Sequence, residues 1–346
     1  MEGIEDRRRP ADPLIYFEHS FLMSESTYSR FPLISIVTPC LNRAAFIAEA
    51  IESVMRQDYP HIEHIIVDGG STDGTLDIVR QYKHLRVLSE RDENLYDALN
   101  KGIRLSSGDI IGHLNSDDCY EPNVFSDVVG SFTEDRDTDS VCGGAVIFEN
   151  TTGNERRILA KYIDSENKGL SYFNLALGVP IINARFFRRH VYDRIGEYDT
   201  SFPIAADRDF LIRAAIAGVK TSALDRRVIW YRAHPGSLTI RSDGGTNRRK
   251  QEDNIRLSRK YLRQKDIPVE LREALCALHT RETLEQAVDC LKRLKIGDVL
   301  SCVFQGCLED RTWPWQFGSY FARRFGASLS RRITRRQTKN LMGLGR

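Results

Sequence analysis

The sequence predicts an α/β protein built on a mostly parallel sheet with helices on its faces. Short runs rich in β-branched residues alternate with stretches whose apolar residues recur at helical spacing. The links between these runs are short, which is the signature of βαβ units. Small polar and acidic residues follow directly after the predicted strands, where a sheet of this class binds its ligands.

The first predicted strand covers residues 33–39, where a β-branched run closes with a proline. Asn42 occupies the position of a helix cap, and residues 44–56 carry apolar side chains at helical spacing. Residues 61–67 form the second predicted strand, and an amphipathic helix follows as far as about residue 82.

A third short strand is expected at residues 86–88, followed by a helix at residues 95–105. The next apolar run, residues 110–114, ends in four small polar residues at 115–118, the last two of which are adjacent carboxylates. Two such acids repel each other unless a cation or a set of hydrogen-bond donors neutralises them. The same residue types are common in turns, so the stretch by itself fits a turn as well as a cation site.

Composition places the chain among ordinary globular proteins. Of its 346 residues, 41% are apolar and 28% are charged, and the net charge of +2 indicates no particular partner. The seven cysteines form no C-x-x-C pair, which favours free thiols in a reducing compartment. No apolar run approaches the roughly 18 residues of a membrane-spanning helix, and no secretory signal begins the chain. These features predict a cytoplasmic protein.

The two common phosphate-binding loops are absent, because neither a P-loop nor a Gly-x-Gly-x-x-Gly fingerprint occurs. Other motifs occur in order: Ser-Ile-Val-Thr-Pro at 35–39 with Asn42, Asp-Gly-Gly-Ser-Thr-Asp-Gly-Thr at 68–75, Tyr-Asp-Ala-Leu-Asn-Lys-Gly at 96–102, and Leu-Asn-Ser-Asp-Asp at 114–118. Together they resemble the family 2 glycosyltransferases, inverting enzymes of the GT-A fold that use a nucleotide-sugar donor and a divalent cation. The resemblance covers roughly residues 33–242. It continues in an acidic motif at 206–210 and a histidine-containing loop at 231–239.

The resemblance implies a donor site at the carboxyl edge of the sheet. Asp68 matches the carboxylate that accepts the imide N–H of uracil, and Thr38 and Pro39 would contact the same base. Glu90 and Asp92 match a segment that lines the base pocket, although solvated loop charge explains these two acids equally well.

Two positions depart from the family pattern. Asn94 replaces the usual glycine at the following turn and is expected to adopt its left-handed conformation. Asn115-Ser116-Asp117 matches the D-x-D signature with an amide in first place, which can still bond the ribose of the donor. Asp117 would ligate Mg²⁺ or Mn²⁺, and Asp118 would orient water or backbone. The missing carboxylate leaves open how strongly the cation is held.

Asp207 is the residue to which the resemblance assigns the catalytic base. Inverting transfer needs a carboxylate opposite the leaving diphosphate to take the proton of the acceptor hydroxyl. The family motif reads Glu-Asp where this chain has Ala206-Asp207. A helix cap is the alternative role for Asp207, because an apolar helix follows at 210–217. Asp209 is expected nearby, in contact with the acceptor.

His234 matches a loop in which a histidine can approach the metal or diphosphate, and we assign it with Asp117 to the metal site. A structural histidine beside a Pro-Gly turn is the alternative. Arg232 and Arg241 are weaker candidates for neutralising phosphate.

Three regions are predicted: an N-terminal extension at 1–30, the glycosyltransferase domain at 31–246, and a helical C-terminal region at 247–346. Amphipathic helices, with breaks near Pro268 and Gly297, would either cover the acceptor side or form a homo-oligomer interface.

The end of the chain combines an aromatic stretch, residues 313–321, with paired arginines. This combination suits a helix lying on the inner, anionic membrane surface. A packed terminal helix with a solvated basic tail explains it equally well. Nucleic-acid binding is not expected, because no recognised module accompanies the tail.

The predicted function is metal-dependent, inverting transfer of a sugar from a nucleotide donor, UDP-linked, to a glycan or lipid-linked acceptor in surface polysaccharide or glycolipid biosynthesis. Its test is spatial: Asp68, Asp117 and Asp207 have to converge on one cleft. A catalytically silent nucleotide-sugar-binding or scaffolding protein is the alternative. Asn115 and Ala206 favour that alternative, because each replaces an acid.

Overall fold

A computed structural model describes residues 31–151, 155–163, 169–179, 182–237, 245–292, 297, 299–300 and 304. The chain divides into two compact units, Met1–Thr246 and Asn247–Arg346. The expectations for residues 1–30, for Arg241 and for the aromatic and arginine-rich end of the chain lie outside the described residues.

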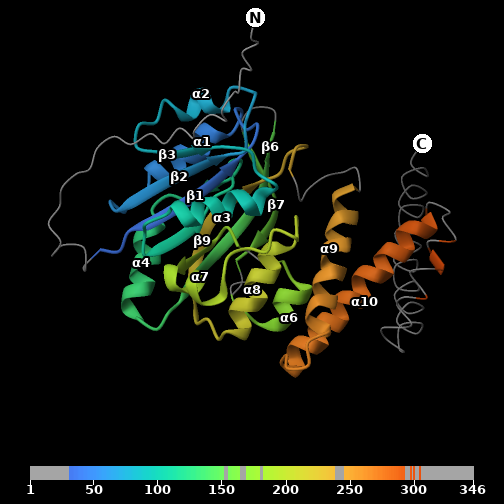
Figure 1. Cartoon of the computed structure of the whole chain (residues 1–346). Coiled ribbons are helices and arrows are strands. Elements are labelled where there is room, and N and C mark those ends of the chain that lie inside the picture. Colours follow the sequence, from blue (N-terminus) through green and yellow to red (C-terminus); the bar gives the residue numbers. More distant parts are fainter. Residues whose placement is uncertain are drawn as a thin grey trace, which may run out of the picture. The chain divides into compact units, whose positions relative to one another are not determined.

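The first unit is built on a sheet to which nine of the described strands contribute (Figure 1). Its first half is parallel and has the order β3 (Arg86–Ser89), β2 (Ile62–Asp68), β1 (Ile34–Cys40), β4 (Ile110–His113). Cys40 lies opposite Asp68, and Asp68 lies opposite Ser89. The three strands β1, β2 and β3 therefore end at one edge. The βαβ pattern of the sequence predicted this half correctly.

The second half of the sheet mixes strand directions. It comprises β8 (Arg185–Arg188), β6 (Ser140–Asn150), β9 (Thr221–Arg232), β5 (Cys119–Tyr120) and β7 (Arg156–Tyr162). β8 runs antiparallel to β4 and β6, whereas β6 and β9 are parallel. The end of β9 pairs with β5, which follows the polar residues after β4. This pairing brings the 231–237 region beside residues 115–118.

Helices cover both faces of this sheet. They are α1 (Ile47–Met55), α2 (Thr75–Val79), α3 (Leu95–Leu105), α4 (Phe125–Glu134), α6 (Tyr172–Leu177), α7 (Arg189–Ile195) and α8 (Ala206–Ile216). Ile34 and Ile36 share one apolar cluster with residues of α1 and α4. Phe187, on the opposite face, packs on Phe210 of α8 with ring centroids 5.2 Å apart. Figure 1 shows α3 crossing the sheet, with α7 and α8 below it.

Helix α3 packs closely on the sheet at Gly102. A Cβ atom on Gly102 would stand 2.2 Å from Cγ1 of Val37, so the helix reaches this depth only with glycine at that position. The bounds of α3 agree with the predicted helix at 95–105. The close packing of Gly102 on Val37 and Val67 therefore sets how far the α3 side chains lie from strands β1 and β2.

Two asparagines behave differently from their predictions. Asn42 does not cap α1, whose N-cap is Phe46. Instead Asn42 adopts a left-handed φ of 54°, and its Oδ1 accepts a hydrogen bond from the Thr72 backbone N–H at 2.8 Å. Asn94 was expected to be left-handed but has an extended φ of −165° and caps α3. In each case the side-chain amide oxygen accepts hydrogen bonds from nearby backbone N–H groups. The sequence does not show where those N–H groups lie.

The second unit contains two long helices among its described residues, α9 (Gly245–Leu262) and α10 (Val269–Lys292). Pro268 precedes α10, as the predicted break requires. The helices share buried polar contacts: Ser258 Oγ lies 2.9 Å from Nδ1 of His279, and Asn254 donates to Glu282 at 3.2 Å.

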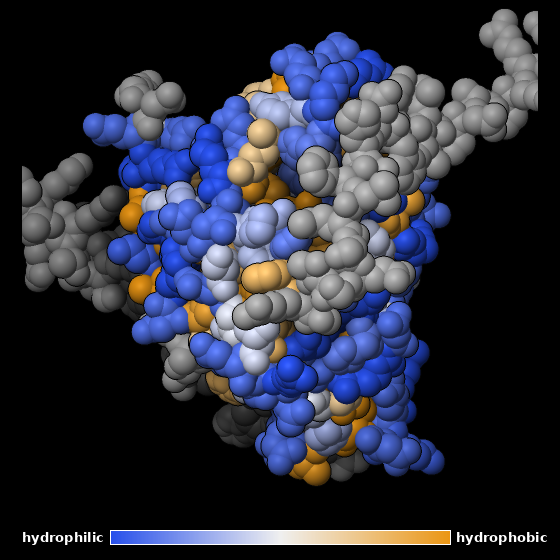
Figure 2. All heavy atoms as spheres, turned by 90° about the vertical axis from the view of Figure 1, so that its left-hand side faces the viewer, coloured by the Kyte–Doolittle hydropathy of each residue, from blue (hydrophilic) through white to orange (hydrophobic). Residues whose placement is uncertain are grey.

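Hydrophilic side chains predominate on the face shown in Figure 2, and hydrophobic ones occur among its coloured residues in small separate groups. In the described part of the chain, no helix has the length and apolarity needed to cross a membrane.

Candidate active site

The β1 and β2 loops are joined at the carboxyl edge of the sheet. Besides the Asn42–Thr72 bond, the Asn42 backbone N–H donates to Ser71 Oγ at 2.8 Å. Asp73 accepts from the Ala44 N–H at 3.1 Å, so the two loops form one platform. Ser71, Thr72 and Asp73 all belong to the motif at 68–75, and their hydrogen bonds to the β1 loop explain why the motif has short polar side chains.

Asp68 lies at the base of this platform and is fully buried. Its Oδ2 accepts hydrogen bonds from the backbone N–H groups of Gly70 and Ser71, both at 3.1 Å, and from Ser89 Oγ at 2.8 Å. Asp68 therefore holds the β2 loop in shape. Its direct contact with a nucleotide base stays a prediction.

Thr38 and Pro39 belong to the buried strand β1. The Thr38 hydroxyl lies 2.9 Å from Nε2 of His64, whose pKa is lowered by burial to about 3. The Thr38 side chain consequently faces a neutral imidazole inside the protein. The expected side-chain contact between Thr38 and a base is not present in this arrangement, because the strand turns that hydroxyl inward.

Glu90 and Asp92 are tied to helix α3 by a single lysine. Nζ of Lys101 lies 3.0 Å from Glu90, 2.8 Å from Asp92 and 3.1 Å from Asp97. The Asp92 carboxylate also sits over Gly69, where an added Cβ would be 2.9 Å from its Oδ2. The side chain of Asp92 is only 10% exposed, so solvated loop charge does not describe it. Burial raises the pKa of Asp92.

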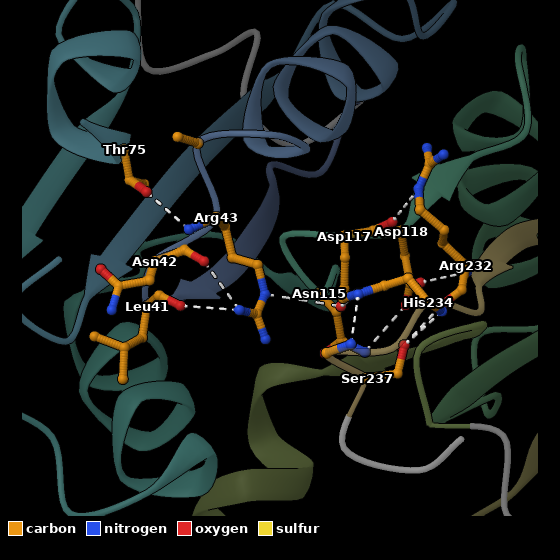
Figure 3. Close-up of polar contacts among 12 residues, drawn as sticks. Leu41, Asn42, Arg43, Thr75, Asn115, Asp117, Asp118, Arg232, His234 and Ser237 are labelled. Atoms are coloured by element: carbon orange, nitrogen blue, oxygen red, sulfur yellow. Dashed lines mark hydrogen bonds and ion pairs between the residues drawn. The ribbon is translucent and has the colours of Figure 1, made fainter. Parts of the chain in front are cut away.

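Residues 115–118 form a turn that is fastened to the end of β9 (Figure 3). Oδ1 of Asp118 accepts from the Arg232 N–H at 2.8 Å, and its Oδ2 accepts from Asn115 Nδ2 at 3.0 Å. Asn183 reaches the same oxygen at 3.4 Å. Asp118 is fully buried, and burial together with the charge of Asp117 raises its pKa well above the usual range. Asp118 therefore fixes the backbone of Arg232 to this turn. Ser116, in the same turn, is buried.

Asp117 and His234 are in direct contact, with Oδ2 of Asp117 2.9 Å from Nε2 of His234. The other ring nitrogen, Nδ1, accepts the Gly236 backbone N–H at 3.2 Å. Since an accepting nitrogen carries no proton, the neutral ring has its proton on Nε2 and donates it to Asp117. The ring of Phe46 packs on His234 with centroids 4.6 Å apart. This geometry makes His234 an orienting partner of Asp117.

The site fits a cation that binds one protein carboxylate and takes its other ligands from phosphate oxygens and water. In the described ranges no group of three or more His, Cys, Asp or Glu side chains could hold a metal. Asp117, which is 15% exposed, offers one hydrogen-bonded carboxylate. Mg²⁺ commonly binds one or two carboxylates and completes its shell with phosphate oxygens and water. Hydrogen bonding to a ligating carboxylate is the usual second-shell support.

Arg43 was not identified from the sequence. Its Nε lies 3.8 Å from Oδ2 of Asp117, and its Nη1 donates to the carbonyl groups of Leu41 and Asn42 at 3.1 and 3.0 Å. Figure 3 shows it reaching Asp117 from the loop after β1. Its place directly after Asn42 in the first motif was the available signal, but only the fold shows that this loop faces residue 117.

Arg232 is a structural residue and not the exposed phosphate ligand we considered. Its side chain is 3% exposed, pairs with Glu49, and donates from Nε to the Asp117 carbonyl at 2.9 Å. The guanidinium also stacks over Phe46 at 5.4 Å from the ring centroid. Arg232 therefore clamps the turn that carries Asp117 to helix α1.

Asp207 occupies the first turn of α8, one residue after its start. The N-cap of α8 is Ala205, so the capping alternative for Asp207 is wrong. Its Oδ1 accepts the Arg208 N–H at 2.7 Å. The hydroxyl of Tyr96 in α3 donates to the Ile204 carbonyl at 3.1 Å, and burial together with the charge of Asp207 raises the pKa of Tyr96. Tyr96 carries no assigned role in the sequence prediction, although it belongs to one of the motifs.

Two arginines fix α8 to its neighbours. Arg208 is buried and donates to the Leu175, Ala176 and Gly178 carbonyls at the end of α6. Arg213 binds Asp209 at 2.8 Å. Asp209 is fully buried in this ion pair, so the expected contact of Asp209 with an acceptor is corrected. Its carboxylate faces along the helix toward Arg213, one turn away.

The predicted residues thus fall into three groups. The first is Asp68, Glu90 and Asp92 at the ends of β2 and β3, with Thr38 and Pro39 on the neighbouring strand β1. The second is Asn115, Ser116, Asp117 and His234, where the turn after β4 contacts the end of β9. The third is Asp207 at the start of α8. Shared loops join the first two groups, and helix α3 joins the first to the third. The convergence of Asp68, Asp117 and Asp207 on one cleft stays a prediction.

Sequence comparison provides independent information. A family model described as "Glycosyl transferase family 2" matches residues 35–196. A PGL/p-HBAD biosynthesis glycosyltransferase of Mycobacterium tuberculosis is 34% identical over 188 residues, covering 53% of this chain and 69% of that relative. Chondroitin synthase of Escherichia coli is 33% identical over 117 residues, covering 33% of this chain and 17% of its own length.

Solved structures share the fold. The mannosyltransferase PcManGT of Pyrobaculum calidifontis, in complex with GDP-Man and Mn²⁺, superposes with a TM-score of 0.55 at 17% identity, covering 91% of this chain and 89% of that chain. Residues 1–349 of S. aureus TarS in complex with UDP give 0.54 at 18% identity, covering 78% and 81%. In a further structure of S. aureus TarS, the match covers 72% of this chain and 43% of that chain, with a TM-score of 0.51. At these identities the likeness concerns the fold, and it confirms the predicted fold class.

Proposed function

The chain belongs to glycosyl transferase family 2 and has the GT-A fold, and from this membership we propose that it is a metal-dependent, inverting hexosyltransferase. The donor is a nucleotide sugar, UDP-linked, and the acceptor is a glycan or a lipid-linked molecule. The observation that carries this proposal is the carboxylate of Asp117, oriented by His234 at 2.9 Å where the turn after β4 contacts the end of β9.

The donor would bind along the carboxyl edge of the sheet. Its base would lie over the platform held by Asp68, with Asp92 and Glu90 at the border, and its ribose beside Asn115. TarS structures with UDP and UDP-GlcNAc support a uridine donor, and the PcManGT complex supports a nucleotide sugar more generally.

Charge on the departing diphosphate is offset from two sides. Asp117 would hold Mg²⁺ or Mn²⁺, which supplies Lewis-acid stabilisation of the diphosphate when it is bound. The PcManGT complex with Mn²⁺ supports this assignment. Arg43 lies 3.8 Å from the same carboxylate and adds a fixed positive charge next to the phosphates. His234 keeps the carboxylate oriented through its Nε2–H.

Asp207 would take the proton of the acceptor hydroxyl as that oxygen attacks the anomeric carbon. The bond between this carbon and the diphosphate oxygen breaks, and the nucleoside diphosphate leaves with the electron pair. Attack from the face opposite the leaving group inverts the configuration. The names of the mycobacterial relatives and of chondroitin synthase support an acceptor in glycolipid or polysaccharide assembly.

A catalytically silent nucleotide-sugar-binding or scaffolding protein is the second candidate. One observation favours it: Asn115 replaces an acid, and its amide is bonded to Asp118 at 3.0 Å. Calorimetry with UDP and Mn²⁺, followed by a donor-turnover assay, separates the two candidates. Binding without turnover supports the silent protein.

Replacing Asp207 by Asn tests the proposed enzyme directly. We expect turnover to fall by about 10²- to 10⁴-fold, the usual range for removing a general base, while UDP binding measured by calorimetry stays unchanged. A thermal-shift screen of UDP-, GDP- and dTDP-sugars with and without Mn²⁺ selects the donor for this assay, because a bound ligand raises the melting temperature. Undiminished turnover by the variant would remove Asp207 from the base role.

A further inference from the structure

Two basic side chains approach the same oxygen of Asp117. Its Oδ2 accepts the Nε2–H of His234 at 2.9 Å and lies 3.8 Å from Nε of Arg43. Figure 3 shows these two side chains reaching the carboxylate from different loops. The contact with His234 is a hydrogen bond, whereas 3.8 Å is too long for one, so Arg43 acts on Asp117 through its charge. Arg43 is therefore a counter-ion of the carboxylate to which we assign the metal.

The guanidinium group of Arg43 is held in place by its own loop. Nη1 donates to the carbonyl groups of Leu41 and Asn42 at 3.1 and 3.0 Å. The backbone N–H of Arg43 donates to Thr75 Oγ1 at 2.8 Å, which fastens the residue to the start of α2. Its side chain is 24% exposed, so water screens the charge only in part. Arg43 thus keeps a positive charge beside Asp117.

The neighbouring ionisable groups do not replace this charge. Among the described residues, Arg43 and His234 are the basic side chains within ion-pair distance of Asp117. His234 donates as a neutral ring and adds no net charge. Arg232 is paired with Glu49, and its Nε donates to the carbonyl of Asp117 and not to the carboxylate. The charge of Asp117 is therefore balanced by Arg43.

This balance has opposite consequences for a cation and for a diphosphate. A divalent cation bound to Asp117 would share that carboxylate with the guanidinium, and two positive charges at such a distance repel each other. A diphosphate is negative and is attracted by Arg43, whose guanidinium is suited to phosphate oxygens. The same fixed charge therefore weakens the binding of the free cation and strengthens the binding of the nucleotide.

We propose that Arg43 makes cation binding at Asp117 depend on the nucleotide. The protein binds the free cation weakly, and it takes up the cation together with the diphosphate or after it. The negative charge of the diphosphate then outweighs that of the guanidinium. This inference rests on the proposed function, because it takes Asp117 as the metal ligand and a nucleotide sugar as the donor.

Replacing Arg43 by Gln removes the charge and keeps an amide that can donate to the loop carbonyls. Without nucleotide, we expect the affinity for Mn²⁺ to rise about tenfold, which the electron paramagnetic resonance signal of free Mn²⁺ measures. Without metal, we expect the affinity for UDP to fall about tenfold, measured by calorimetry. Opposite shifts identify a charge effect, because damage to the site would weaken the binding of both.

Two further variants serve as controls. Arg43→Lys keeps the positive charge and should bind Mn²⁺ and UDP with affinities close to those of the wild-type protein. Arg56→Gln removes an arginine at the end of α1 that is 59% exposed and paired with Glu52, and it should leave both affinities unchanged. If Arg43→Gln does not fold, Arg43→Met provides the same loss of charge.

Asp117→Asn tests the metal assignment separately. This variant should lose Mn²⁺ binding in the presence of UDP. If it does so while the neutral variants of Arg43 bind Mn²⁺ no more tightly than wild type, or bind UDP equally well, the role of Arg43 is overturned and the proposed function stands. Mn²⁺ binding with UDP that is the same in wild type and Asp117→Asn, or a wild-type protein that binds no nucleotide, overturns the proposed function and this inference with it.

Discussion

At the scale of single residues, the site depends on how protons are distributed between paired groups. His234 donates from Nε2 to Asp117 because the Gly236 N–H occupies Nδ1. The same ring as a metal ligand through Nε2 would have to move its proton to Nδ1, against that N–H. This geometry gives His234 the place of an orienting partner of Asp117, while metal binding by Asp117 stays a proposal.

Replacing His234 by Ala tests this description. Removing a second-shell partner typically lowers metal affinity or activity by about 10- to 100-fold, so we expect a loss in that range for Mn²⁺ affinity and for kcat/KM at limiting Mn²⁺. Titrating activity against Mn²⁺ measures both. His234→Gln should recover part of the loss, since an amide N–H can still donate to Asp117. His190→Ala, at a histidine 53% exposed, is the control. Equal losses in the Ala and Gln variants would contradict an orienting role.

At the scale of elements, the placement of α3 decides which loops meet. Its N-terminus is capped by Asn94, its middle is sunk against Val37 at Gly102, and its polar side chains hold loops on both sides of the site. Helices α6, α7 and α8 are joined by Arg208, which donates to the Ala176 carbonyl in α6, and by Arg213, which donates to the Ile195 carbonyl at the end of α7. These arginines satisfy helix ends that would otherwise lack partners.

A pair of glycine substitutions tests the position of α3. Gly102→Ala places a methyl group 2.2 Å from Val37, and overpacking of this kind costs about 1–3 kcal/mol. Gly130→Ala in α4 meets nothing within 4 Å and should stabilise the protein by about 0.5–1 kcal/mol through helix propensity. Chemical denaturation of both variants measures the two free energies. Stabilisation by both substitutions would show that α3 is not held against the sheet.

At the scale of the whole molecule, two buried histidines, His64 on β2 and His113 on β4, are neutral in the folded protein. Burial lowers the pKa of His64 and of His113 to about 3, against about 6.5 for an exposed histidine. Below the higher value the unfolded chain binds protons at these positions and the folded protein does not. Folding stability from these groups is therefore present above roughly pH 6.5 and falls as the pH drops toward 3.

Acid titration of stability provides the corresponding measurement. Each buried histidine should reduce the free energy of unfolding by about 1.4 kcal/mol per pH unit below roughly pH 6.5. His64→Gln, which keeps a partner for Thr38, should flatten the dependence of melting temperature on pH between about 6 and 4. An identical slope in wild type and His64→Gln would mean that His64 is protonated in the folded protein.

The sequence alone determined the α/β class, the parallel βαβ beginning, the bounds of α3 and the family resemblance. These features depend on hydrophobic period and on motifs, which are local along the chain. It did not place Asn42, Asn94 or Asp209, and it did not reveal Arg43 or the hydrogen bond from Tyr96 to the Ile204 carbonyl. Those properties depend on which distant groups meet: Asp117 and His234 are 117 positions apart. A side chain's charge state and role follow from its neighbours in space, so only the folded sheet and its helices decided them.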